Sequence, residues 1–144
     1  MKPPVANLAA LLSTLEPVLN DGVYVYSSVP AGTNLGSMPV VATLHEKEGV
    51  TIIARETDVL RANLPILFRA AWITLTVNSD LHAVGLTAAF ASALGDAGIS
   101  CNVVAGAHHD HLFVPVERAE DALSVLRELQ RRASSDSSLE GLVP

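Results

Sequence analysis

The feature that most constrains the fold is an order of elements that occurs twice along the chain. The segments VATLHEKEGVTIIARETDVL, from Val41, and VVAGAHHDHLFVPVERAEDA, from Val103, each predict strand, turn, strand and helix. Few residues are identical between the two segments, so the repeat lies in the order of the secondary-structure elements. A unit this small cannot bury both faces of its elements alone, so we expect the two halves to pack against each other.

The second half predicts the order strand, helix, strand, strand, helix. Residues 70–78 (AAWITLTVN) predict a strand, and 81–98 predict a helix that Asp80 caps and Gly98 ends. The helical face is expected to contain Leu81, Val84, Ala88, Ala91 and Leu94. Two strands over 99–107 and 111–117, then a helix over 118–133, complete the half.

In the first half, the loop Pro30–Pro39 stands where the second half has its first helix. An opening helix that Pro17 ends can supply the missing cover, because Val5, Leu8, Leu12 and Leu15 have helical spacing. The other elements expected are a strand over Gly22–Val29, a hairpin over Val40–Glu56 that turns near Lys47, and a short helix over 57–64 with Thr57 as cap.

Together these elements predict an α+β fold, with an antiparallel-rich sheet and helices on one face. The halves are expected at 1–68 and 69–133, and the polar segment 134–144 is expected to be a frayed tail.

Composition narrows the class of protein. The net charge of −6 disfavours nucleic acid as a partner. Only 17% of residues are charged, against about 25% in average proteins, which favours burial of apolar surface in a homodimer. The single cysteine excludes an internal disulfide and suits a cytoplasmic protein. No apolar run approaches the ~18 residues of a membrane span, so no membrane contact is expected.

The segments WITLTVNSDLHAVGLTAAFASALGDAGISCNVVAGAHHDHLFVPVERAEDAL and HEKEGVTIIA resemble a small bacterial family of two tandem ACT-like domains. The resemblance spans roughly residues 10–130. It implies ferredoxin-like halves, related to the regulatory part of aspartate kinases. It also implies amino-acid binding between paired domains and no catalysis. No cofactor is expected. Val84 stands where many ACT domains have a proline, so ligand contacts transfer less safely from the aspartate kinases.

A ligand site is expected where the second strand-to-helix connection begins. A helix that begins there has free N–H groups, which would favour the carboxylate of a ligand. Asp80 could bind the ammonium group of the same ligand. Gly85 allows close approach of a ligand, and Asn102 can both donate and accept. The candidate ligand-binding residues are Asn78, Ser79, Asp80, Val84, Gly85, Asn102, His108 and Asp110. The competing interpretation is an ordinary capped helix with a glycine that serves packing.

The histidine cluster of the second hairpin leaves several interpretations open. His108, His109 and His111 could bind a metal, which would make the chain a metal-binding protein or metal-dependent enzyme. No H-E-x-x-H motif and no paired C-x-x-C supports that alternative. The favoured interpretation is a structural turn, in which Asp110 bonds the turn backbone and His111 begins a strand. A pH-sensitive contact is a further alternative.

Catalysis is disfavoured. Cys101 lies in the apolar strand ISCNVVA, where a free cysteine is usually buried and inert. The sequence therefore predicts a non-catalytic regulatory protein that binds a small molecule, most simply an amino acid. A purely structural oligomerisation module is the remaining alternative.

Overall fold

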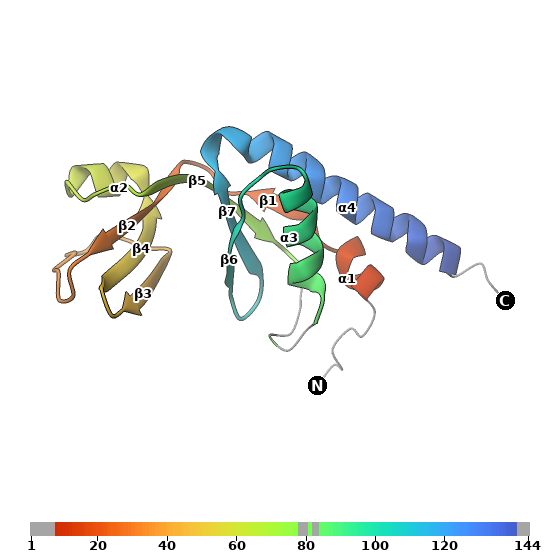
Figure 1. Cartoon of the computed structure of the whole chain (residues 1–144), viewed down its shortest axis with the longest axis horizontal. Coiled ribbons are helices and arrows are strands. Elements are labelled where there is room, and N and C mark those ends of the chain that lie inside the picture. Colours follow the sequence, from red (N-terminus) through yellow and green to blue (C-terminus); the bar gives the residue numbers. More distant parts are fainter. Residues whose placement is uncertain (1–7, 78–80, 82–83, 141–144) are drawn as a thin grey trace.

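The computed structural model describes residues 8–77, 81 and 84–140, with the backbone alone for 136–140. The elements follow in the order α1 (Leu8–Ser13), β1 (Pro17–Leu19), β2 (Tyr24–Val29), β3 (Ala42–Glu46), β4 (Gly49–Arg55), α2 (Glu56–Arg61), β5 (Phe68–Leu75), α3 (Leu86–Asp96), β6 (Asn102–Ala105), β7 (Asp110–Pro115), the 3-10 turn η1 (Val116–Arg118) and α4 (Ala119–Glu140) (Figure 1). The predicted α+β class is confirmed.

One antiparallel sheet runs through both halves. Its strand order is β3-β4-β2-β5-β7-β6, and β1 pairs with β5 beside this path. Every pairing among the described strands is antiparallel, whereas the sequence predicts an antiparallel-rich sheet. The sheet curls, so that its two ends, β3 and β6, face each other across an open side (Figure 1).

Strand β5 joins the two halves. Its first residues, from Phe68 to Ala70, pair with β2, whereas Ile73 to Leu75 pair with β1. Its other edge pairs with β7 from Ala70 to Leu75. The proposed boundary between residues 68 and 69 therefore falls inside a strand that serves both halves. The strand β1 lies before that boundary in the sequence but pairs with the part of β5 that belongs to the second half.

The main core lies between the helices and one face of the sheet. Phe90 of α3 and Leu126 of α4 are fully buried there against Ile73 of β5 and Leu112 of β7. Val59 of α2 covers the same face in the first half. No helical residue belongs to the buried cluster of the opposite face within the described chain. Helices on one face of the sheet are thus confirmed.

The opening helix packs elsewhere than the sequence suggested. Leu11 and Leu12 of α1 are buried in the core of the second half, with α3 and α4. The physical reason is the next strand, because Pro17 of β1 pairs with Leu75 and holds α1 at that end of β5. Leu35 and Met38 of the loop cover the first half instead.

Helix α3 begins at Leu86, five residues later than predicted. Gly85 precedes it with φ +96°, a left-handed conformation that a helix interior does not contain. The expected face was wrong in part, since Leu81 and Val84 are 68% and 90% exposed. Leu86, Phe90 and Leu94 form the buried face. Asp80, the predicted cap, lies outside the described residues, and Gly85 holds the N-cap position.

Two other helix boundaries differ from the prediction. Helix α4 continues to Glu140 instead of ending at 133, because no glycine or proline interrupts the sequence before Gly141. Helix α2 begins at Glu56 after Arg55, so Thr57 lies inside the helix and is not its cap. Among the described residues, no helix has both the length and the apolar character to cross a membrane.

Candidate functional site

The face of the sheet opposite the helices is rich in aromatic rings. Every phenylalanine, tyrosine and tryptophan except Phe90 lies there, namely Tyr24, Tyr26, Phe68, Trp72 and Phe113. Strand register explains this grouping, because Trp72 pairs with Phe113 and Tyr26 pairs with Phe68, and paired residues share a face. The rings of Trp72 and Phe113 are stacked, 6.0 Å between centroids.

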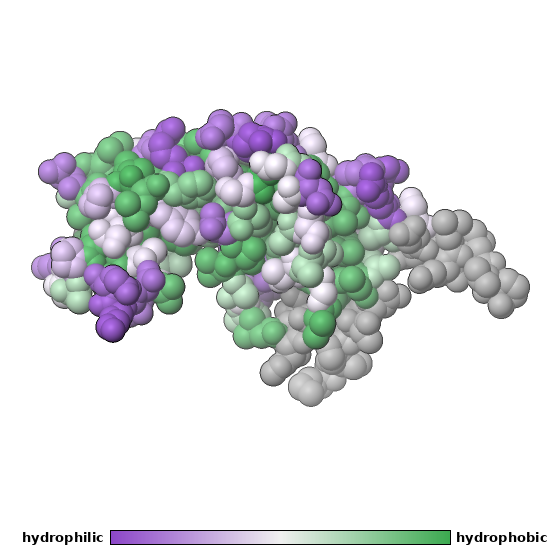
Figure 2. Space-filling view, in the orientation of Figure 1, coloured by the Kyte–Doolittle hydropathy of each residue, from purple (hydrophilic) through white to green (hydrophobic). Residues whose placement is uncertain are grey.

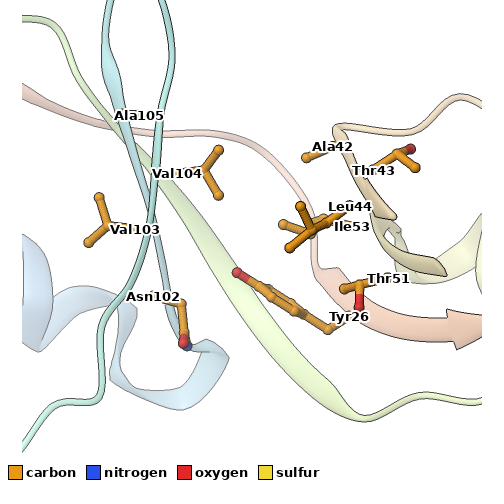
Figure 3. Close-up of a pocket in the computed structure, with 10 residues that line it drawn as sticks. All are labelled: Tyr26, Ala42, Thr43, Leu44, Thr51, Ile53, Asn102, Val103, Val104 and Ala105. Atoms are coloured by element: carbon orange, nitrogen blue, oxygen red, sulfur yellow. The ribbon is translucent and has the colours of Figure 1, made fainter. Parts of the chain in front are cut away.

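A cleft opens on this face between the edge strands β3 and β6. Its volume is about 510 Å³, and it is lined by Tyr26, Ala42, Thr43, Leu44, Thr51, Ile53, Asn102, Val103, Val104 and Ala105 (Figure 3). A smaller compartment of about 340 Å³ is lined by Val40, Val41, Ala42, Trp72, Val104, His111 and Phe113. Because both contain Ala42 and Val104, the compartments adjoin. We call the two together the inter-edge cleft.

The space-filling view shows where the cleft opens. The molecule is hollowed between its two lobes, and hydrophobic residues border the hollow (Figure 2). The first lobe contains β2, β3 and β4, and the second contains β6 and β7 (Figure 1). The cleft is thus formed by both halves of the chain, in the size range of small-molecule sites.

Tyr26 and Asn102 bring polar atoms to the larger compartment. The Tyr26 hydroxyl points from β2 toward β6 (Figure 3). It makes no hydrogen bond with any described residue, and burial, followed by the nearby Cys101, raises the pKa of this phenol. The Asn102 amide donates to the Phe113 carbonyl at 3.4 Å, which leaves its Oδ1 free to accept.

Trp72 and His111 form a polar pair in the smaller compartment. The indole Nε1 donates to His111 Nδ1 at 3.0 Å, and Thr74 Oγ1 lies 3.3 Å from the same nitrogen. A ring nitrogen that accepts this bond carries no proton, so the imidazole is neutral with its proton on Nε2. Burial, with a smaller effect of His109, lowers the pKa of His111, whereas Asp110 opposes that shift.

The predicted ligand residues are divided between the two faces of the sheet. Asn78, Ser79 and Asp80 lie outside the described residues. Val84 and Gly85 precede α3, and Asp110 lies on the same face, because it pairs with Leu75, which is buried beneath the helices. Asn102 lies on the opposite face, in the inter-edge cleft. The structure therefore does not bring Asn102 together with the start of α3.

The start of α3 leaves backbone donors available. Its first backbone hydrogen bond runs from the Ala89 amide to the Gly85 carbonyl at 3.0 Å. The N-cap residue makes no side-chain hydrogen bond to the helix. The amides of Leu86, Thr87 and Ala88 therefore have no acceptor among the described residues, and they favour a negative group.

Asp110 is an unusual residue of the same face. It is only 7% exposed, yet its carboxylate makes no hydrogen bond or ion pair with another described residue. Burial raises the pKa of this carboxyl, partly offset by His111. The predicted bond from Asp110 to the turn backbone is not seen, because the Gly106 amide and His109 carbonyl close the turn at 2.9 Å and Asp110 already begins β7.

The histidines of the second hairpin do not converge on a common point within the described part of the chain. His108 is exposed, and its ring centroid is 6.5 Å from that of His109. His109 Nδ1 is buried without a partner, and His111 Nδ1 is occupied by Trp72. The described part of the chain contains no group of three histidine, cysteine or acidic side chains placed to hold a metal ion.

Cys101 is poorly suited to act as a nucleophile. It is half-buried, and burial raises the pKa of its thiol to about 11. Very little thiolate therefore exists at neutral pH.

Sequence reasoning missed most of the inter-edge cleft. A usable signal was present in the strands, because Tyr24 and Tyr26 alternate with Val25, and Trp72 alternates with Ile73. When aromatic residues occupy every second position of a strand and aliphatic residues occupy the positions between them, the two faces of the strand differ. Nothing in the letters indicates that Ala42 and Val104 lie across one cleft.

Comparison with known proteins places both halves in one family. A family model described as ACT domain matches residues 3–71, and a second ACT-domain model matches 68–128. A protein of unknown function from Vibrio cholerae, titled a possible transport protein, is 40% identical with a TM-score of 0.79, covering 89% of this chain and 99% of that one. No curated protein matches the chain.

Two aspartate kinase structures share the fold. The ligand-free regulatory subunit from Thermus thermophilus has a TM-score of 0.59 at 10% identity, covering 81% of this chain and 97% of that one. Aspartokinase III of E. coli, in complex with aspartate and ADP, has a TM-score of 0.60 at 13% identity. The similarity covers 78% of this chain but only 32% of that enzyme.

Proposed function

The chain belongs to the ACT-domain family, and we propose that it is a non-catalytic regulatory protein whose ligand is an amino acid. The observation that carries the proposal is the pair of ACT domains joined through one sheet. This arrangement resembles the regulatory subunit of an aspartate kinase and a part of aspartokinase III, whose structure is titled as a complex with aspartate and ADP. Tandem ACT domains of this kind support a ligand-binding regulatory role.

We propose that the amino acid binds on the helical face, at the start of α3. The amides of Leu86, Thr87 and Ala88, which have no acceptor among the described residues, would donate hydrogen bonds to its carboxylate. The Asp110 carboxylate lies on the same face, is 7% exposed and has no partner among the described residues, so it would accept hydrogen bonds from the ammonium group. Val84, Gly85, His108 and the segment 78–80 complete the proposed site.

Two further properties belong to the proposal. A homodimer would cover apolar side chains such as Leu60 and Leu67, which are 58% and 65% exposed. A cytoplasmic protein would keep Cys101 as a free thiol.

Thermal melting against each of the twenty amino acids tests the ligand. At about a hundred times its Kd, a ligand adds about 2.7 kcal/mol of stability and raises the Tm by several degrees. Asp110→Asn removes the charge that faces the ammonium group and is expected to weaken binding by about 10- to 100-fold. Asn102→Ala, on the opposite face, is the matched control and should keep the shift.

Two results would contradict the proposal. If no amino acid at millimolar concentration changes the Tm, the chain does not sense amino acids in the ordinary affinity range. If a shift occurs but Asn102→Ala abolishes it and Asp110→Asn does not, the ligand lies in the inter-edge cleft instead.

A further inference from the structure

The inter-edge cleft separates the two edge strands of a single sheet. Consecutive residues line it on both sides, Ala42 to Leu44 from β3 and Asn102 to Ala105 from β6. Because neighbouring residues of a strand point to opposite faces, the backbone edges themselves must border the cleft. An edge strand has outward N–H and C=O groups that no ladder pairs. The cleft therefore offers backbone donors and acceptors from both halves.

The lining carries no formal charge. The larger compartment contains no acidic or basic side chain, although Glu46 accepts a hydrogen bond from Thr51 at its rim. The only titratable side chain of the smaller compartment is His111, which is neutral because Trp72 donates to its Nδ1. A charged ligand would lose its hydration here without gaining a counter-charge. The cleft thus disfavours a zwitterionic amino acid and favours an uncharged molecule.

The shape of the lining favours a flat ligand. The partly exposed rings of the lining are those of Tyr26 and Trp72, and the buried ring of Phe113 packs against both at centroid distances of 5.8 Å and 6.0 Å. Ala42 and Val104 oppose them with short aliphatic side chains. Planar rings stack favourably on such a surface.

Two polar atoms border the otherwise apolar inter-edge cleft. The Tyr26 hydroxyl and Asn102 Oδ1 lack hydrogen-bond donors or acceptors among the described residues, and both border the larger compartment. A hydroxyl can donate or accept, whereas Oδ1 only accepts. A ligand that matches them needs at least one donor on its edge.

From this lining we propose that the inter-edge cleft binds an uncharged, planar heteroaromatic molecule of one or two rings. The ring lies against the aromatic side chains of the lining, and its polar edge bonds Tyr26, Asn102 and the free edges of β3 and β6. This site is independent of the proposed amino-acid site, which lies on the other face of the sheet.

Trp72 is the only tryptophan, so its fluorescence reports on the cleft. The probes are adenine and nicotinamide, with nicotinate as the matched charged control, since it shares the ring of nicotinamide. We expect adenine or nicotinamide to change Trp72 emission saturably at micromolar to low millimolar concentration. Nicotinate should bind at least ten times more weakly. Backbone amide shifts measured by NMR should change in residues 42–44 and 102–105.

Variants locate the binding. Ala42→Phe fills the junction of the compartments and should abolish the response. Tyr26→Phe removes only the hydroxyl and should weaken binding about 2- to 12-fold. Tyr24→Phe is its matched control, because the Tyr24 hydroxyl donates to the Asp21 carbonyl. Asp110→Asn, which tests the amino-acid site, should leave the response unchanged.

Several results would overturn the proposal. These are no saturable response to either neutral probe, equal binding of nicotinate, or a response that Ala42→Phe leaves intact. Amide shifts confined to other residues would do so even if Ala42→Phe failed to fold. Self-association that shields Trp72 in the absence of any probe would assign the cleft to a second copy of the chain.

Discussion

Replacement of Asp110 by asparagine is expected to stabilise the protein at neutral pH. The side chain is 7% exposed and burial raises its pKa, so the charged carboxylate is less favourable in the folded chain than in the unfolded chain. Such a group costs about 1–3 kcal/mol. Asparagine keeps the shape and removes the charge. With an unfolding entropy of about 2.1 cal/mol/K per residue over 144 residues, each kcal/mol corresponds to about 3 °C. The expected rise in Tm is therefore about 3–10 °C.

The raised pKa of Asp110 determines the direction in which stability changes with pH. Its folded pKa is raised above the ordinary value of 3.8, so the folded state binds this proton more readily than the unfolded state. The contribution of Asp110 to the free energy of unfolding therefore increases as the pH falls through the folded pKa toward 3.8. The stability difference between Asp110→Asn and wild type should be largest at neutral pH and shrink in acid.

The assay is thermal melting of both proteins from about pH 7 to about pH 4. Asp21→Asn, an exposed aspartate in a loop, is the control and should change stability by less than about 0.5 kcal/mol. A neutral-pH Tm of Asp110→Asn below that of wild type would refute the reasoning. It would mean that the carboxylate is held by stabilising hydrogen bonds.

Two stability predictions concern packing and backbone geometry. Leu126→Ala removes a fully buried side chain of α4 and should lower the free energy of unfolding in urea by about 2–5 kcal/mol. Its control, Leu60→Ala, changes a side chain that is 58% exposed and should cost less than about 1 kcal/mol. Equal losses in the two variants would contradict the described core. Gly49→Ala places a Cβ 2.7 Å from the Val29 carbonyl oxygen at φ +153° and should cost about 2 kcal/mol or more. Gly32→Ala, with a positive φ but no atom within 4 Å, should cost about 1 kcal/mol, and a similar Tm loss for both would argue against the clash.

Much of the fold could be predicted because its signals are local. The hairpin of β3 and β4 forms where alternating residues flank Lys47 and Glu48, close to the predicted turn. The strand β5 and helix α4 likewise follow residue patterns within single segments. The delayed start of α3 was missed because the apolar spacing continues through Leu81 and Val84, and periodicity ignores the φ angle of Gly85.

The candidate sites were less predictable. Asn102 and Gly85 both have chemistry suited to an amino acid, so sequence reasoning placed them in one site. The pairing of Asn102 with Phe113 puts Asn102 on the aromatic face, whereas α3 covers the other face. Side-chain direction in a strand depends on register, which single letters do not specify.

Most of the elements, their order and the two-part layout could be read from the sequence, whereas the strand β1 could not. These follow from periodicity and short motifs, which act over neighbouring residues. Three features became visible only in the folded chain: β5 serves both halves, α1 packs on the second half, and β3 and β6 border a cleft. Those features depend on strand pairing and sheet curl between residues far apart in the chain, where many pairings satisfy the same local pattern and packing selects one.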